Sequence, residues 1–101
     1  MILIYITFPN KQEAKKIGRI LIEKRLAGCV NMFPVEAIYQ WKGKITEEKE
    51  VVLIAKTFEK NFSKIEKLVK KLHSYETPCI LAIPVNKVSK NYLNWIKKET
   101  I

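Results

Sequence analysis

The chain lacks aspartate altogether and contains only one histidine, three glycines and two cysteines among its 101 residues. Without aspartate, carboxylate chemistry depends on glutamate alone. The few glycines form no glycine-rich phosphate loop, and no serine, histidine and aspartate triad can be assembled. These absences give no support for an enzyme, and we expect the protein to require no cofactor.

Long hydrophobic runs are missing as well, because the apolar stretches fall far short of the roughly 20 residues that span a bilayer. Met1 leads directly into the apolar residues 2–6, with no basic segment and no small-residue cleavage site. These residues are typical of a first strand and not of a secretion signal. We therefore expect no membrane span and a cytoplasmic protein.

Neither Cys29 nor Cys79 has a partner at the C-x-x-C spacing of zinc sites.

Arginine is scarce, with two residues among the 19 basic ones, although the net charge is +9. A protein that recognises phosphate groups specifically usually uses more arginine, because its planar guanidinium binds them with two hydrogen bonds. Lysine mixed with glutamate is typical of the surface of heat-adapted proteins. We interpret the charge mainly as a solvated surface, with attraction of anions as the lesser alternative.

The hydrophobic pattern predicts four strands and three helices. Residues 2–8 are apolar on both faces and predict a central strand. Asn10, followed by Glu13, is a capping signal for a helix that we expect to end near Gly28. The remaining elements expected are a hairpin of residues 29–41 and 50–57, a helix over 59–72, a strand over 79–85 and a last helix capped by Ser89.

This order of elements predicts an α+β fold, a ferredoxin-like βαββαβ sandwich of one domain, residues 1–101, with an antiparallel 4-1-3-2 sheet and an extra C-terminal helix. The prolines agree with that order, because Pro34 and Pro84 fall in the second and fourth strands, which are its edges. Cys29 and Cys79 are then on opposite edges, too far apart for a disulfide.

The central strands predict self-association. Two helices cover only one face of such a sheet, yet Val52 and Ile54 alternate with Leu53 and Ala55, so that the third strand is apolar on both faces. Large exposed apolar patches are rare in monomers. Either the terminal helix or other subunits must cover the second face, and we expect a homo-oligomer.

Several polar and aromatic residues have both a functional and a structural interpretation. Lys56 interrupts an apolar strand and could bind an anion, or extend its ammonium group to the rim of the sheet. Tyr39 and Trp41 could form a stacking wall for a ligand, or simply pack.

His73 lies where a helix meets a strand, in a position we expect at the surface. It could bind a metal or transfer protons, or it could be a capping imidazole held by a carboxylate such as Glu76. Cys29 is interpreted as a core residue.

A set of short motifs spread over the whole chain resembles the CutA divalent-cation tolerance family. They are Thr7-Phe8-Pro9, Glu23 to Asn31, Tyr39-x-Trp41-x-Gly43-Lys44, Glu50-Val51, Lys56-Thr57, His73-x-Tyr75-x-Thr77-Pro78 and Tyr92-Leu93-x-Trp95. The resemblance implies a stable cytoplasmic homotrimer of PII-like architecture, linked to tolerance of copper or another divalent cation. It places a ligand-binding cleft between subunits, with Tyr39, Trp41, Lys56, His73, Tyr75 and Trp95 as its residues.

Two positions depart from the family pattern. Copper ligation in the family is attributed partly to a cysteine in the first strand and a glutamate after the motif proline, and here these positions hold Ile6 and Cys79. His73 and Cys79 together form the alternative metal site that we consider, and its soft thiol would favour Cu(I).

Two other classes of protein share the βαββαβ order. A basic nucleic-acid-binding module would carry stacking aromatic residues in its third strand, and residues 51–55 contain none. An acylphosphatase-like hydrolase would need an arginine in a glycine-rich loop after the first strand, and residues 7–11 offer no such loop. Nucleic acid is therefore the alternative partner and not the expected one.

Overall fold

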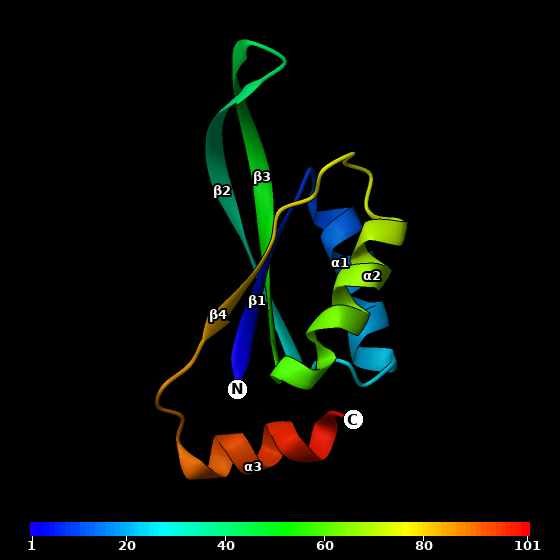
Figure 1. Cartoon of the computed structure of the whole chain (residues 1–101), viewed down its shortest axis with the longest axis vertical. Helices are drawn as coiled ribbons and strands as arrows, with labels where there is room; N and C mark the ends of the chain where they lie inside the picture. Colours follow the sequence, from blue (N-terminus) through cyan, green and yellow to red (C-terminus); the bar gives the residue numbers. More distant parts are fainter.

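The computed structural model describes all residues of the chain, 1–101 (Figure 1). Its elements are β1 (Ile2–Phe8), α1 (Lys11–Glu23), β2 (Cys29–Trp41), β3 (Lys44–Thr57), the short 3-10 helix η1 (Glu59–Asn61), α2 (Phe62–Leu72), β4 (Ile80–Pro84) and α3 (Lys90–Glu99). None of the three α-helices has both the length and the apolar character needed to cross a membrane.

The four strands form one antiparallel sheet in the order β2-β3-β1-β4. This is the predicted 4-1-3-2 order counted from the opposite edge, so the expected ferredoxin-like α+β fold is confirmed. Pro34 lies in β2 and Pro84 in β4, the two edge strands, where a missing backbone donor costs least.

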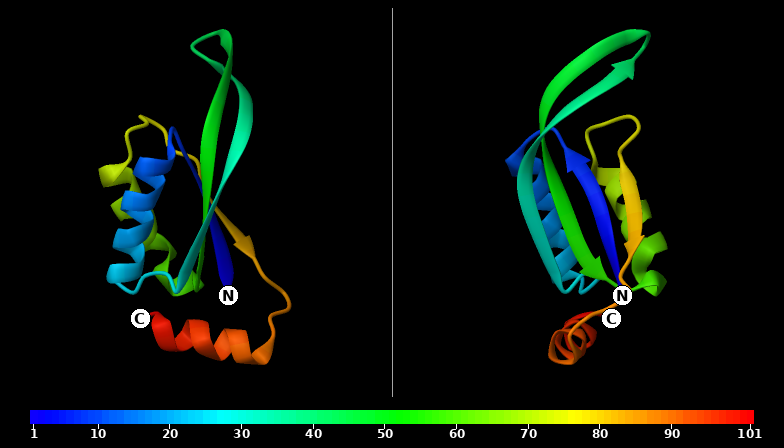
Figure 2. Two further views of the ribbon diagram at one scale, coloured as in Figure 1. Left: turned by 180° about the vertical axis from the view of Figure 1, so that it is seen from behind. Right: turned by 90° about the vertical axis from the view of Figure 1, so that its left-hand side faces the viewer.

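The core lies between the sheet and the pair α1 and α2, which cover one face of it (Figure 2). Successive side chains of a strand point to opposite faces, and every second residue of β1 is buried. The buried residues at the centre of this layer are Ile4, Ile6 and Phe8 of β1, Leu53 and Ala55 of β3, Ala14, Ile17 and Leu21 of α1, and Ile65 and Val69 of α2.

The β2–β3 hairpin is longer than predicted, because β3 begins at Lys44 and not at residue 50. Lys42 and Gly43 both have positive φ, 52° and 81°, which is the geometry of a tight turn that continues the twist of both strands. Trp41 therefore pairs directly with Lys44. Residues 44–49 are mostly polar, so the hydrophobic pattern did not predict this part of the strand.

The end of α1 also differs from the prediction. The helix ends at Glu23, and Arg25, not Gly28, takes the left-handed conformation, with φ 57°. The Gly28 amide donates instead to the carbonyl of Lys56. A Cβ on Gly28 would lie 2.8 Å from Cδ1 of Ile96, so this glycine allows α3 to approach closely and does not end the helix.

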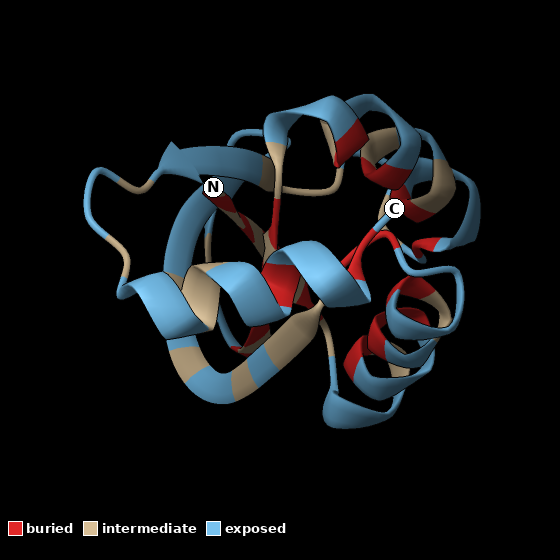
Figure 3. Cartoon of the chain, turned by 90° about the horizontal axis from the view of Figure 1, so that it is seen from below, coloured by how far each residue is buried: buried red, intermediate tan, exposed pale blue.

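The last helix, α3, lies across the end of the sheet and not over its second face (Figures 1 and 2). Most of α3 is exposed, with a short buried stretch (Figure 3), and Ile96 is its one buried residue. The Arg25 guanidinium donates to the carbonyls of Lys98 and Glu99, and the Ile101 amide donates to the Arg25 carbonyl. These bonds satisfy carbonyls that the end of a helix leaves free.

Because α3 is at the end, this chain leaves the face of the sheet opposite α1 and α2 uncovered. On that face, Leu81 and Ile83 in the edge strand β4, which pair with Tyr5 and Leu3 of β1, are 52% and 42% exposed. The terminal helix therefore does not cover the apolar second face. This excludes the first of the two alternatives given above.

Replacing Ile96 by alanine should destabilise the protein by about 2–4 kcal/mol, because the side chain is fully buried under α3 and the cavity would close only partly. The measurement is guanidinium unfolding at one fixed protein concentration. Lys97→Ala, in the next and exposed position, is the control and should change the free energy of unfolding by less than about 0.5 kcal/mol. Equal effects of both variants would show that α3 is not packed as described.

Candidate functional site

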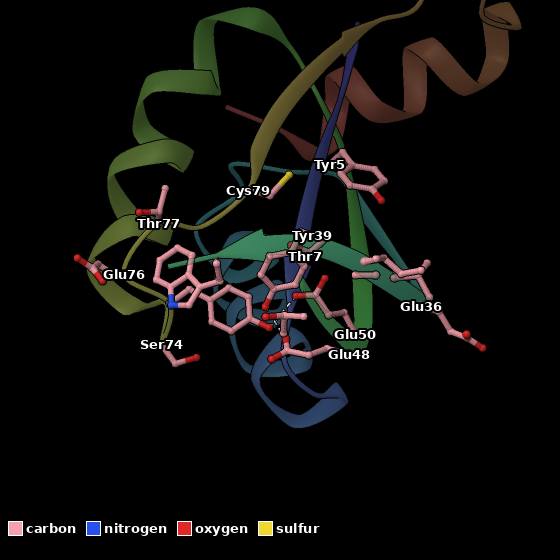
Figure 4. A pocket seen from close by; sticks show the side chains of 16 residues that line it. Tyr5, Thr7, Glu36, Tyr39, Glu48, Glu50, Ser74, Glu76, Thr77 and Cys79 are labelled. Carbon is pink, nitrogen blue, oxygen red and sulfur yellow. Dashed lines mark hydrogen bonds between the residues drawn. The ribbon is translucent and has the colours of Figure 1, made fainter. Parts of the chain in front are cut away.

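A groove of about 880 Å³ opens between the β2–β3 hairpin and the loop that follows α2 (Figure 4). We call it the hairpin groove. β1, β2, β3 and the loop all contribute to it, and its lining residues are Tyr5, Thr7, Val35, Glu36, Ala37, Ile38, Tyr39, Trp41, Thr46, Glu48, Glu50, Ser74, Tyr75, Glu76, Thr77 and Cys79.

Two glutamate–tyrosine pairs form the polar centre of the groove. Glu48 and Glu50 are two residues apart in β3 and therefore point to the same face. The hydroxyl of Tyr39 donates to Glu48 Oε2 at 2.9 Å, and the hydroxyl of Tyr75 donates to Glu50 Oε2 at 2.7 Å. Tyr39, Glu48 and Glu50 lie close together, whereas Glu36 and Glu76 lie at the margins (Figure 4).

Burial and the two carboxylates together raise the pKa of the neighbouring acidic groups. Burial, and then the hydrogen bond to Glu50, raise the pKa of Tyr75 above its usual range. The hydrogen bond to Glu48 raises the pKa of Tyr39, and burial followed by the charge of Glu50 raises the pKa of the Cys79 thiol. At neutral pH both phenols are therefore neutral donors, and Cys79 is a thiol and not the thiolate that binds soft metals.

His73 lies behind the groove, with its side chain completely buried, and not at the surface as predicted. Its Nε2 is 2.7 Å from the carbonyl oxygen of Thr7, and its Nδ1 accepts from the Tyr75 amide at 3.0 Å. These partners assign the ring proton to Nε2. The ring also stacks on Phe8, with 4.7 Å between centroids.

The carboxylate next to His73 is Glu13, whose Oε2 is 3.5 Å from Nδ1, and not Glu76. Glu13 is in the first turn of α1, where its amide donates to the side chain of Asn10, as the capping signal predicted. Its own side chain does not complete the capping box. Glu13 Oε2 accepts from the Ser74 amide and so holds the loop that carries Tyr75.

The fold already uses the imidazole of His73, one of the two predicted metal ligands, within this single chain. Cys79 lines the groove, but both ring nitrogens of His73 have partners within the protein. No three or more His, Cys, Asp or Glu side chains come close enough together to hold a metal ion. The two cysteines lie in or beside the opposite edge strands and are free thiols.

The six residues predicted for the cleft fall in different places. Tyr39, Trp41 and Tyr75 line the hairpin groove. Lys56 does not, because it is near the other end of β3, where its Nζ lies 5.3 Å from the ring centre of Tyr92.

Trp95 also lies near Tyr92, with 5.8 Å between the two ring centres, and is therefore outside the hairpin groove.

Glu48 was missed because its strand was predicted to begin only at residue 50. The i, i+2 spacing of two glutamates in one strand was the available signal.

The sandwich with its long β2–β3 hairpin and end-lying third helix defines a class, the PII-like proteins of ferredoxin-like fold. The chain superimposes on a structure described as PII-like protein CutA from Nostoc sp. PCC 7120 with a TM-score of 0.92, at 31% identity, covering 100% of this chain and 98% of that one. The model of the CutA1 divalent ion tolerance protein family matches residues 2–99, and the chain belongs to this family. The predicted resemblance is confirmed.

Three relatives match over nearly their whole length. The divalent-cation tolerance protein CutA of Archaeoglobus fulgidus is 46% identical over 98 residues, covering 97% of this chain and 95% of that one. The protein of the same name from Thermotoga maritima is 44% identical over 101 residues, with 100% of both chains covered. The crystal structure of CutA1 from Pyrococcus horikoshii gives a TM-score of 0.96 at 40% identity, covering 100% of this chain and 99% of that one.

Replacing Tyr75 by phenylalanine should destabilise the protein by about 1–3 kcal/mol at neutral pH, because it leaves the buried Glu50 without its donor. The pKa of Tyr75 is higher in the folded chain than in the unfolded one. Above about pH 10 the unfolded chain therefore loses this proton first, and stability falls as the pH rises. The difference between wild type and variant should shrink from about pH 9 to about pH 11.

The measurement is the free energy of unfolding at several pH values. Tyr92→Phe is the control, because the Tyr92 ring packs beside Trp95 and Lys56 while its hydroxyl makes no hydrogen bond within the chain. A constant difference for Tyr75→Phe would contradict the assigned hydrogen bond.

Proposed function

We propose that the protein is a non-enzymatic homotrimer that protects the cell against copper or another divalent cation. In this proposal it binds the ion, or a small ligand, in clefts where subunits meet, and the bound state serves as a signal. The hairpin groove of each subunit forms one side of such a cleft. Membership of the CutA1 divalent ion tolerance family supports the cation part of the proposal.

The single observation that carries the proposal is the position of the groove. It contains Tyr5 and Thr7, which are on the face of β1 that α1 and α2 do not cover, and it continues to the exposed hairpin. The exposed apolar side chains of Leu81 and Ile83 in β4 lie on the same face. A neighbouring subunit that covered these side chains would also cover the groove.

A metal ion in this cleft would need ligands from more than one subunit. One chain supplies Glu48 and Glu50, whose carboxylates suit hard divalent cations, and the thiol of Cys79, which suits Cu(I) after deprotonation. Because one chain does not bring three such ligands together, the remaining donors belong to the neighbour in this proposal. His73 is left out of the ligand set, since the fold uses both of its nitrogens.

We also propose a cytoplasmic location. Cys29 and Cys79 are both free thiols, and reducing compartments keep thiols in this state. Fractionation of cells followed by detection with an antibody is the direct test. Recovery of the protein from the periplasm or an organelle would contradict the proposal.

Native mass spectrometry of the purified protein, titrated with Cu(II) and then with Cu(I) under reducing conditions, tests the assembly and the ion together. We expect a trimer that takes up one ion per subunit. Glu50→Gln should weaken uptake by about tenfold or more, because a charged ligand becomes neutral while the acceptor for Tyr75 remains.

Glu47→Gln is the matched control. Glu47 is exposed, adjacent to Glu48 in β3, and points to the opposite face of the strand, so its charge is removed without a change in the groove. Uptake by this variant should equal that of the wild type. A monomer would contradict the proposed assembly, and a trimer without copper would limit the proposal to a small ligand.

A further inference from the structure

The charge of the hairpin groove is opposite to that of the protein. The chain carries a net charge of +9, yet the groove is lined by four glutamates, Glu36, Glu48, Glu50 and Glu76, and by no lysine, arginine or histidine. Electrostatic focusing in a concave, partly apolar site attracts ligands of the opposite sign. Phosphates and other anions are therefore poorly matched to this groove.

Glu50 provides a second and independent observation. Its side chain lines the groove although the residue is only 8% exposed. Oε2 accepts from Tyr75, while no hydrogen bond or ion pair within the chain reaches the other oxygen, Oε1. Every fully buried polar side-chain atom of the chain has a hydrogen-bond partner. Oε1 has none, so it is not fully buried and is accessible from the groove. A largely buried carboxylate with one accessible acceptor oxygen can take a charged donor from a ligand in the groove.

The aromatic lining indicates what kind of donor fits. Tyr39 and Trp41 are 37% and 42% exposed, and the Lys42 ammonium group already lies 5.8 Å from the centre of the Trp41 ring, so this ring accepts a cation within the chain itself. Ring faces attract cations, and they do so best with flat or soft organic cations whose water shell is weak. The phenol hydroxyls of Tyr39 and Tyr75 remain protonated, which makes them neutral groups and not charged metal ligands.

We propose that the hairpin groove binds an organic monocation, with a protonated amine or amidine group donating to Glu50 Oε1 and the flat part of the molecule lying against Trp41. The inference builds on the proposed function, because it names the chemical class of the small ligand in the cleft. The volume of about 880 Å³ lies in the range of small-molecule sites and exceeds what a single metal ion requires.

The test compares two probes of nearly the same shape, benzamidinium and the neutral benzamide. Trp95→Phe leaves Trp41 as the one remaining tryptophan, so its fluorescence reports on the groove. Benzamidinium should change this fluorescence in a saturable way and bind at least about tenfold more tightly than benzamide, because only the cation makes a charge-assisted hydrogen bond with Glu50. This comparison in an otherwise unchanged protein does not depend on how a groove variant folds.

Glu50→Gln in the same background should reduce the affinity for benzamidinium by about tenfold and leave benzamide unchanged, whereas Glu47→Gln should change neither. Equal binding of both probes, binding that survives Glu50→Gln, or no saturable binding would each overturn the inference. The mass and copper uptake of the same samples are measured separately. A trimer that binds copper but does not prefer benzamidinium refutes only this inference, and a monomer that prefers benzamidinium refutes only the proposed assembly.

Discussion

The antiparallel pairing of β1 with β3 is the constraint on which the rest of the structure depends. Its register places Ile4 opposite Ala55 and Ile6 opposite Leu53 on the side of the helices, and Thr7 opposite Val52 on the uncovered side. A shift by one residue would exchange these two faces. The same register fixes where Glu48 and Glu50 emerge, because they continue the row that contains Val52. The register of β1 and β3 therefore determines both which side chains form the core and which line the groove.

The buried imidazole connects these two faces. His73 contacts Phe8 in the core and bonds to the carbonyl of Thr7, while its Nδ1 holds the amide of Tyr75, whose hydroxyl reaches Glu50. A chain of hydrogen bonds through buried polar groups rigidifies its surroundings. The phenol of Tyr75 is thus positioned by His73, a buried residue that does not line the groove.

Much of the fold could be predicted from sequence, because the apolar periodicity, the edge prolines and the order of elements all gave the same sheet. The groove could be predicted only in part. Tyr39, Trp41 and Tyr75 were found through their motifs, but Glu48 was hidden in a polar stretch whose pairing depends on the turn at Gly43. The position of His73 was wrong because a lone histidine in a loop gives no signal of its depth. Its carboxylate neighbour Glu13 is 60 positions away in the sequence, a contact that only the folded chain creates.

The β2–β3 hairpin extends beyond the last residues of β1, since Phe8 pairs with Val51 and the strand residues before Val51 pair only with β2. A two-stranded ribbon is marginally stable by itself in water. Half of the groove, including Tyr39 and Glu48, is built on this ribbon, while Tyr75 belongs to the loop anchored on the core. In the proposed assembly, order in the ribbon and association with a neighbour that covers it are therefore one coupled equilibrium. If the proposed trimer forms, the concentration of the protein in the cell sets how many complete sites exist, and dilution removes the site while the sandwich below it stays folded.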